Sequence, residues 1–305
     1  MPIKHETAFN PRYGEAVAVA PNVVRVTCDN PGPFTGSGTN SYIVGGRGAV
    51  AVVDPGPVDP AHQNALDRAL AGRPVSHVVV THTHADHSPL ARPLAERTGA
   101  IVVAEGPHRA ARALHEGERN VMDASADRAF RPDQAVDHGD RIAGDGWTLT
   151  AIHTPGHTAN HCAFALDDGP LLSGDHVMAW ATSIVAPPDG AMDDYMASLD
   201  TLLERQRHGL DPFYLPGHGG PVTKPQSYVR ALKAHRLMRE RAILTRVRGG
   251  DRTIPRMVEH IYRTTDRRLH GAAALSVLAH LEGLIAQGRV VADGPPSLEA
   301  AYAPA

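Results

Sequence analysis

The chain has 305 residues, of which 42% are hydrophobic and 21% charged, and its formal net charge is −3. This length supports a large buried core, so the fold need not depend on disulfide bridges. Its two cysteines, Cys28 and Cys162, stand far apart in sequence, which argues against a disulfide framework or a zinc ribbon. No signal-peptide core follows the N-terminus, and no apolar stretch is long enough to cross a membrane. We therefore expect a cytoplasmic protein with no membrane contact.

Charge is unevenly distributed along the chain. Residues 1–224 contain 17 basic and 26 acidic side chains, a net charge of −9, whereas residues 225–305 contain 13 basic and 7 acidic ones, a net charge of +6. Such an imbalance is found in proteins that contact nucleic acid, and it also arises from an ordinary solvated helical face. Both interpretations stay open at this point.

The first two thirds of the chain alternate short apolar runs with turns and amphipathic segments, which predicts a layered α/β fold. The expected strands lie within residues 41–46, 49–56, 77–82, 100–104, 147–154, 161–166 and 170–174. The first two of these strands are expected to pair with each other. Asp167, Asp168 and Gly169 predict a hairpin between the last two strands. Residues 105–116 have a composition that favours a helix after the fourth strand.

The pattern changes to helical near Pro225. Helices are expected within residues 228–248, 253–265 and 269–288, followed by a short strand at 289–293. This order is typical of a winged helix. We therefore predict a catalytic domain at 1–222 and a winged-helix-like domain at 223–305, with residues 295–305 frayed at the end.

The motif THTHADHS (residues 81–88) directly follows an apolar strand. His82 and His84 are one residue apart, so on an extended backbone both side chains point to the same side and can hold one ion. Asp86 and His87 follow where the chain turns toward a helix, and the turn can direct them to a neighbouring point. Imidazole nitrogen and carboxylate oxygen are the ligands that Zn²⁺ and similar ions select. The motif therefore predicts a metal site rather than a chance cluster.

Four groups in one loop do not complete a site for two metal ions, so further ligands are expected elsewhere. Three candidates are His157 in HTPGHT, Asp175 in LLSGDH and His218 in LPGHGG. Each follows an apolar run and stands near glycine, as expected where backbone approaches an ion closely. Each alone is equally consistent with an ordinary loop residue, but their shared setting favours a ligand role.

This pattern resembles the metallo-β-lactamase superfamily, with Asp54 in VVDPG as its first landmark and the HxHxDH loop as its second. The resemblance covers roughly residues 20 to 222 and implies an αββα sandwich with the site at the sheet edges. Asp54 would not bind the metal itself but would orient one of the ligand histidines or the loop that carries them. The implied ligand set is His82, His84 and His157 on one metal ion, Asp86, His87 and His218 on a second, and Asp175 bridging both.

The whole chain also resembles the lactamase-β-like protein 2 group, through the segments 30–45 and 193–203, the block YLPGHGGPV and the helical tail. That resemblance implies a metal-dependent endoribonuclease acting on single-stranded RNA. Asn40 and Tyr195 lie in the two similar segments and are candidates for lining the substrate cleft. Generic labels in the family also include hydroxyacylglutathione hydrolase, so a small anionic ester or thioester is the alternative substrate.

The expected cofactors are two divalent metal ions, Zn²⁺ first, with Mn²⁺ or Fe²⁺ as alternatives. Two such ions about 3.5 to 4 Å apart convert a bridging water into hydroxide and polarise the scissile group. Asp86, with a spare carboxylate oxygen, is the candidate to orient that nucleophile and to pass a proton to the leaving group.

Two other classes of function are alternatives, namely a mononuclear-iron oxygenase of the persulfide type and a DNA-binding metal sensor. The seven-ligand set disfavours a centre with one metal ion. The candidate recognition helix at 269–284 has almost no basic or amide side chains with which to read base edges. A homodimer is an open expectation.

Overall fold

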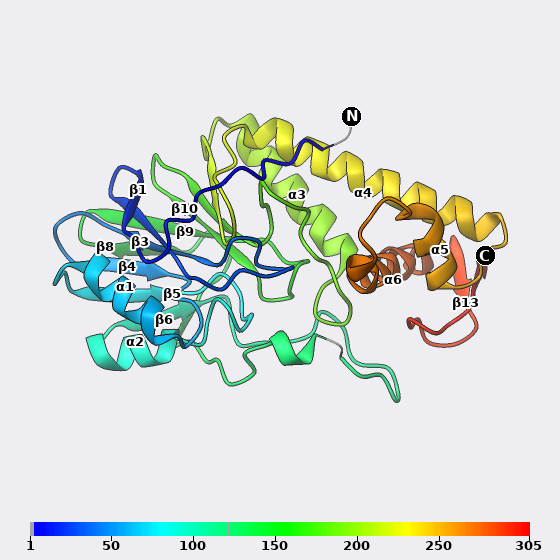
Figure 1. Ribbon diagram of the computed structural model, residues 1–305, viewed down its shortest axis with the longest axis horizontal. Helices are drawn as coiled ribbons and strands as arrows, with labels where there is room; N and C mark the ends of the chain where they lie inside the picture. Colours follow the sequence, from blue (N-terminus) through cyan, green and yellow to red (C-terminus); the bar gives the residue numbers. More distant parts are fainter. Residues whose placement is uncertain (1–2, 121) are drawn as a thin grey trace.

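Two facing sheets form the larger part of the protein, shown in the computed structural model, which describes residues 3–120 and 122–305 (Figure 1). The first sheet has seven strands in chain order: β1 (Val17–Ala20), β2 (Val23–Thr27), β3 (Asn40–Val44), β4 (Val50–Val53), β5 (Val75–Val79), β6 (Ile101–Ala104) and β7 (Gln134–Ala135). The second runs in the order β12 (Tyr214–Pro216), β11 (Leu171–Gly174), β10 (Cys162–Leu166), β9 (Trp147–His153) and β8 (Arg141–Gly144). The hairpin between β10 and β11 is confirmed.

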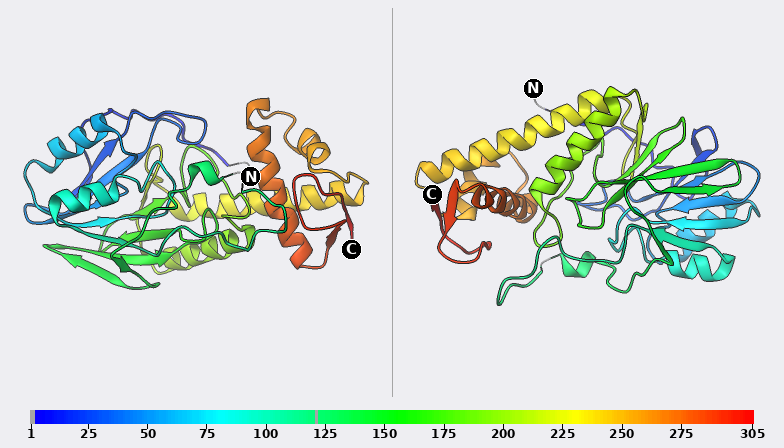
Figure 2. Two further views of the ribbon diagram at one scale, coloured as in Figure 1. Left: turned by 90° about the horizontal axis from the view of Figure 1, so that it is seen from below. Right: turned by 180° about the vertical axis from the view of Figure 1, so that it is seen from behind.

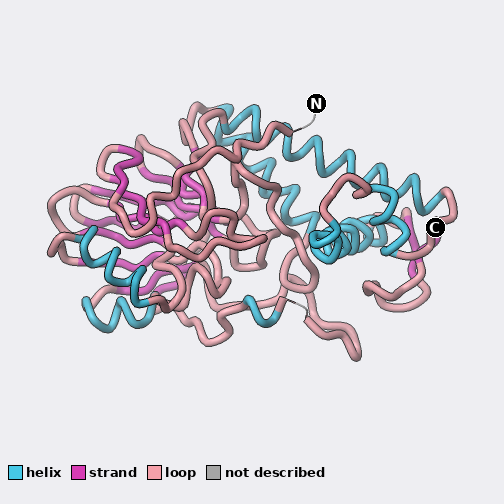
Figure 3. Tube along the Cα trace, in the orientation of Figure 1, coloured by secondary structure: helices cyan, strands magenta, loops and turns pink. Residues whose placement is uncertain are grey.

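Alternation of side chains along the strands explains why the sheets stack. In β4, Val50 and Val52 pack against α1 (Pro60–Leu70) and α2 (Ala91–Thr98), whereas Ala51 and Val53 pack against the second sheet. The outer face of the second sheet is covered by α3 (Met192–Arg207) and the first half of α4 (Pro225–Arg248). The layers are therefore helices, sheet, sheet, helices, as the αββα expectation requires, and the tube view in Figure 3 shows helices on both sides of the strands.

The remaining elements form a smaller helical unit with its own core. It contains α5 (Ile254–Ile261), the 3-10 turn η2 (Arg267–Leu269), α6 (His270–Ala286) and the pair β13 (Val290–Ala292) and β14 (Tyr302–Pro304). The long helix α4 joins both parts. Its first half contributes Val229 and Leu232 to the core under the second sheet, and its second half contributes Ile243 and Val247 to the small unit (Figures 1 and 2). The division at residue 222 remains a prediction, and α4 begins three residues after it.

Two details of the predicted elements are wrong. Residues 105–116 form bends, turns and coil rather than a helix, and Arg109 and Arg112 reach distant groups there, the backbone oxygen of Ala159 and the carboxylate of Glu282. The C-terminal end is not frayed either. It forms β14, in which Tyr302 is fully buried.

Among the described residues, one helical stretch, Arg267–Ala286, is long and apolar enough to cross a bilayer by length and composition. In the fold it packs as a core helix, with Val277, Leu281 and Leu284 buried in the small unit and Ala279 packed under the second sheet. The packing of this helix therefore accounts for its apolar composition. Both cysteines are free and buried, as expected.

Candidate metal centre

The ends of four strands bring the candidate ligands to one place, and a fifth strand places Asp54 beside them. The motif at residues 81–88 follows β5, Asp175 follows β11, His218 follows β12, and His157 lies in the loop after β9. Asp54 directly follows β4 and adopts a left-handed backbone with φ of 49°. All seven predicted ligands converge at this edge.

The first group consists of His82, His84, His157 and Asp175, all buried. Nδ1 of His84 lies 3.0 Å from Nε2 of His82 and 3.0 Å from Nε2 of His157. The second group consists of Asp86, His87 and His218, and its two imidazole Nε2 atoms lie 3.3 Å apart. Within each group the candidate ligand atoms lie within 4.8 Å of one another.

Asp175 lies between the two groups. Its Oδ2 is 3.2 Å from Nε2 of His218 and 3.7 Å from Nε2 of His157, and its Oδ1 is 3.6 Å from Nε2 of His87. That Oδ1 is buried and has no hydrogen-bond donor among the described residues. A carboxylate so placed can contact a cation in either group.

The hydrogen bonds made by Nδ1 of the histidine rings fix which nitrogen faces the interior of the centre. Nδ1 of His157 lies 2.6 Å from the carbonyl oxygen of Ile184, and Nδ1 of His218 lies 3.1 Å from that of Gly38. A carbonyl oxygen only accepts, so each Nδ1 carries a proton and each neutral ring presents the lone pair of Nε2 to the interior.

The same reasoning fixes the proton on Nδ1 of His87 and of His82. Nδ1 of His87 donates to Oδ2 of Asp54 at 3.1 Å. Nδ1 of His82 faces the hydroxyl oxygen of Thr81 at 3.0 Å, and that hydroxyl already donates to Asp54 at 2.7 Å, so it accepts from His82. Nε2 of four rings therefore faces the interior, and neighbouring ring nitrogens lie 3.0 to 3.3 Å apart. Imidazole nitrogens together with carboxylate oxygens form a donor set for divalent metal ions.

Electrostatics differ between the two groups. Burial, aided by His157, lowers the pKa of His84 to about 3, so this ring remains neutral. Burial would also lower the pKa of His218, but Asp175 and Asp86 outweigh it and raise that pKa to about 10. The two carboxylates beside His218 therefore attract positive charge strongly in the absence of metal, as a cation site must.

Glycine is required where the loop after β12 crosses the centre. A Cβ atom on Gly217 would lie 2.4 Å from Oδ1 of Asp175 and 2.7 Å from Cε1 of His87. The LPGHGG pattern is thus explained by backbone that passes directly over two candidate ligands.

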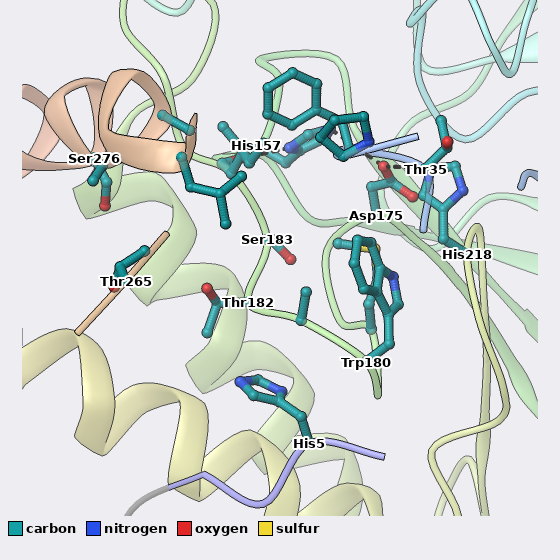
Figure 4. Close-up of a pocket in the computed structure, with 18 of the residues that line it drawn as sticks. His5, Thr35, His157, Asp175, Trp180, Thr182, Ser183, His218, Thr265 and Ser276 are labelled. Atoms are coloured by element: carbon teal, nitrogen blue, oxygen red, sulfur yellow. Dashed lines mark hydrogen bonds and ion pairs between the residues drawn. The ribbon is translucent and has the colours of Figure 1, made fainter. Parts of the chain in front are cut away.

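The centre opens into a cavity of about 410 Å³ that reaches the small helical unit. Figure 4 shows Asp175, His157 and His218 at one end, and Thr265 and Ser276 from the helical unit across from them. Most of its wall is apolar and includes Phe34, Trp180, Ile184, Leu269 and Ala272.

The sequence profile described as the metallo-beta-lactamase superfamily matches residues 34–218. The chain belongs to this superfamily. A second profile, described as a beta-lactamase associated winged helix domain, matches residues 253–295, which confirms the C-terminal winged helix. The predicted hydrolase class and αββα fold are likewise confirmed, because the superfamily comprises metal-dependent hydrolases and the ligand groups are present.

Individual relatives agree with this assignment. The chain is similar to the atrochrysone carboxyl ACP thioesterase nsrC of Aspergillus novofumigatus, with 30% identity over 237 residues, 77% of this chain and 65% of that protein. It is similar to the beta-lactamase-like protein 2 homolog of Drosophila melanogaster, with 27% identity over 88% of this chain and 89% of that protein. A solved beta-lactamase domain protein from Burkholderia ambifaria superposes with a TM-score of 0.78 at 25% identity, over 99% of this chain and 97% of that one.

The two predicted substrate residues are placed differently from expectation. Asn40 is fully buried and its amide donates to the carbonyl oxygens of Pro216 and Gly219, so it holds the loop that carries His218. Tyr195 is also fully buried, and its hydroxyl donates to the carbonyl oxygen of His176. Neither side chain lines the cavity. Both contact backbone instead, which is the structural role that buried polar side chains usually have.

Several supporting residues were not selected from the sequence. His161 accepts from the backbone N–H of Asp175 at 3.1 Å, and the hydroxyl of Thr39 donates to Oδ2 of Asp86 at 2.9 Å. Thr81 links Asp54 to His82. The position of His161, four residues after His157, could have indicated a role near the metal centre. Nothing in the sequence connects Thr39 to Asp86, which is 47 residues away.

Proposed function

We propose that this protein uses two divalent metal ions, Zn²⁺ first, to hydrolyse an ester or thioester bond in a small substrate with an apolar part. The observation that carries the proposal is the cavity, because the candidate ligands lie in its wall and most of the rest of that wall is apolar. A volume of about 410 Å³ suits a small molecule held inside the protein. The thioesterase name of a relative with 30% identity supports the same substrate class.

His82, His84 and His157 would hold one ion, Asp86, His87 and His218 the other, and Asp175 would contact both. When bound, such ions supply an activated water near neutral pH and polarise the carbonyl of the substrate. The side chains of the protein would orient the water and the leaving atom, and Asp86 is the clearest case.

Asp86 is the proposed proton carrier. Its side chain is 25% exposed and lines the cavity, and Oδ2 accepts from Thr39. Burial would raise its pKa, but His87 and His218 lower that pKa well below the ordinary value. The group is therefore a carboxylate, able to accept a proton from the attacking water and to pass it to the leaving atom.

Cleavage of single-stranded RNA is the second candidate. Tyr262 lines the cavity with the guanidinium of Arg239 over its ring, 4.5 Å from the ring centre. An aromatic ring beside a cation is a stacking platform for a base. The net charge of +6 in residues 225–305 supports the same candidate.

The winged helix gives no support to a DNA-reading regulator. α6, the candidate recognition helix, is buried along Val277 to Leu281 and packs between the small unit and α3. A helix covered on these faces does not present its side chains to a DNA groove. The two ligand groups likewise favour a centre with two ions over a mononuclear oxygenase.

A substrate panel tests the proposal. Zinc-loaded protein is incubated with an acyl thioester, a p-nitrophenyl ester, a labelled single-stranded RNA and a phosphodiester chromogen, with His82→Ala as the control. We expect turnover of the thioester and the ester that His82→Ala lacks. Turnover of RNA alone would replace the ester proposal with the second candidate, and turnover of none of the four would refute both.

A further inference from the structure

The cavity contains a second polar region away from the candidate ligands, on the inner face of α4. His235, Arg236 and Arg239 stand at helical positions that share one face, and all three line the cavity. Thr182, Ser183, Thr265 and Ser276 also line the cavity, and Figure 4 shows Thr265 and Ser276 across from Asp175 and His218. The region therefore shares one space with the catalytic end.

Arg236 carries a buried charge without a carboxylate partner. The residue is 3% exposed, and it donates to two neutral acceptors, the carbonyl oxygen of Ser183 and the hydroxyl of Ser276. Its Nε is buried with no acceptor, and within residues 3–120 and 122–305 no acidic side chain lies at ion-pairing distance. A buried cation without a counter-ion is costly, so a bound anion would stabilise it.

Arg239, one turn further along α4, is half-buried and likewise has no carboxylate partner among the described residues. Its Nη1 donates to the carbonyl oxygen of Ile261 and its guanidinium lies over Tyr262, while its Nε is buried without an acceptor. In the part of the chain that the structure describes, no carboxylate pairs with it. The two guanidinium groups lie in the wall of one cavity, and a guanidinium fork matches an oxyanion geometrically.

Charges elsewhere along the cavity do not compensate for the two arginines. The acidic side chains that line it are Asp86 and Asp175, both in the candidate metal centre. Burial, with Arg236 and Arg239 adding to it, lowers the pKa of His235 to about 4, so this neighbour is neutral and offers Nδ1, which is also buried without a partner. The wall of the cavity at α4 is therefore positive, and most of the remaining wall is apolar.

We propose that Arg236 and Arg239 form a subsite, in the cavity wall formed by α4, for an anionic group of the substrate, a carboxylate or a phosphate. The substrate class this defines is an ester or thioester whose apolar segment separates the scissile bond from a terminal anion. This inference rests on the proposed hydrolase function for the position of the scissile bond. The subsite itself follows from the unpaired arginines alone.

Arg236 has a second role that sets how the subsite must be tested. It holds the carbonyl oxygen of Ser183, and the next residue, Ile184, accepts from Nδ1 of His157. Substitution of Arg236 would therefore disturb a candidate ligand as well as the subsite. Arg239 instead donates to the carbonyl oxygen of Ile261 and lies over Tyr262, so it is the residue to change.

Binding is measured first, by titration calorimetry of the zinc-loaded full chain with butane-, hexane- and octane-1-sulfonate, and with hexan-1-ol as the neutral control. We expect at least one sulfonate to bind with one-to-one stoichiometry, Arg239→Gln to weaken it about tenfold or more, and Arg239→Lys to restore part of the affinity. The matched control is Arg241→Gln, on the exposed side of the same helix. Thermal melting of each variant reports whether it folds.

Turnover is measured second, with p-nitrophenyl hydrogen adipate and p-nitrophenyl hexanoate, which differ in the terminal carboxylate. Wild type and Arg241→Gln should prefer the adipate ester in kcat/KM, and Arg239→Gln should lose that preference. Sulfonate affinity that is absent in wild type or unchanged in Arg239→Gln overturns the subsite. If neither ester is cleaved while the sulfonate still binds in an Arg239-dependent way, the proposed hydrolase function fails and the subsite stands.

Discussion

Asp54 and His87 are joined by a hydrogen bond of 3.1 Å between Oδ2 and Nδ1, although 33 residues separate them in sequence. The same carboxylate also accepts from the backbone N–H and the hydroxyl of Thr81, both at 2.7 Å. One side chain therefore fixes the proton on Nδ1 of His87 directly and on Nδ1 of His82 through Thr81. It acts on a histidine in each candidate metal group without belonging to either.

This relationship predicts the effect of Asp54→Asn. The amide can present N–H to His87, which favours the wrong tautomer and turns the lone pair of Nε2 away from the metal centre. We expect metal affinity to fall about tenfold to a hundredfold while the fold is kept. Competition with a chelating dye measures the affinity. Asp168→Asn, at an exposed turn position with φ of 51°, should bind metal as wild type does, and equal affinity in the two variants would contradict the role of Asp54.

Asp175→Ala tests the shared position of that carboxylate. Since Asp175 lies within 3.2 to 3.7 Å of His87, His157 and His218, its loss should remove at least one equivalent of metal and most of the turnover. Elemental analysis together with the rate of ester hydrolysis measures both quantities. Full metal content with normal turnover would show that Asp175 does not contact both ions.

The sequence was sufficient for the candidate ligands because they stand at strand ends in a strict order. His157, Asp175 and His218 each follow an apolar run and stand near glycine, so a local pattern reports their position. The fold followed from the same alternation, and the winged helix from the order of helices after Pro225.

The cavity wall could not be predicted in this way. Arg236 and Arg239 look like ordinary members of a solvated basic helix, and their burial depends on how α4 packs against α6 and the loop that contains Ser183. The prediction that Asn40 and Tyr195 line the substrate cleft differs from the structure for another reason. Their segments resemble a family pattern, but the pattern records packing under the loops rather than contact with substrate.

Thr39→Val tests how the orientation of Asp86 affects turnover. The hydroxyl of Thr39 donates to Oδ2 of Asp86 and is fully buried, and valine has nearly the same shape without the donor. Because Asp86 would lose one of the hydrogen bonds that fix its orientation, we expect kcat to fall about tenfold with metal content unchanged. Stopped-flow rates on metal-quantified protein measure this. A change in metal content with an unaltered kcat would assign Thr39 to metal binding instead.

Acid sensitivity of the fold is predicted at His62, a buried histidine under β3. Burial lowers its pKa from 6.5 to about 4, although nearby Asp59 opposes the shift, and one of its ring nitrogens lies 2.8 Å from the hydroxyl oxygen of Ser41. Between these two values the unfolded chain binds a proton that the folded chain does not. Stability is therefore fully present above about pH 6.5 and is lost as the pH falls toward 4, by about 3 kcal/mol from this residue.

Urea denaturation at a series of pH values measures the slope. His62→Gln should be less stable at neutral pH but should show a flatter decline between pH 6.5 and 4, since glutamine does not titrate. His208→Gln, at an exposed position after α3, should decline as wild type does. Release of metal in acid affects wild type and both variants alike, so it cancels in the difference between them. A decline equally steep in His62→Gln would show that another group accounts for the acid sensitivity of the fold.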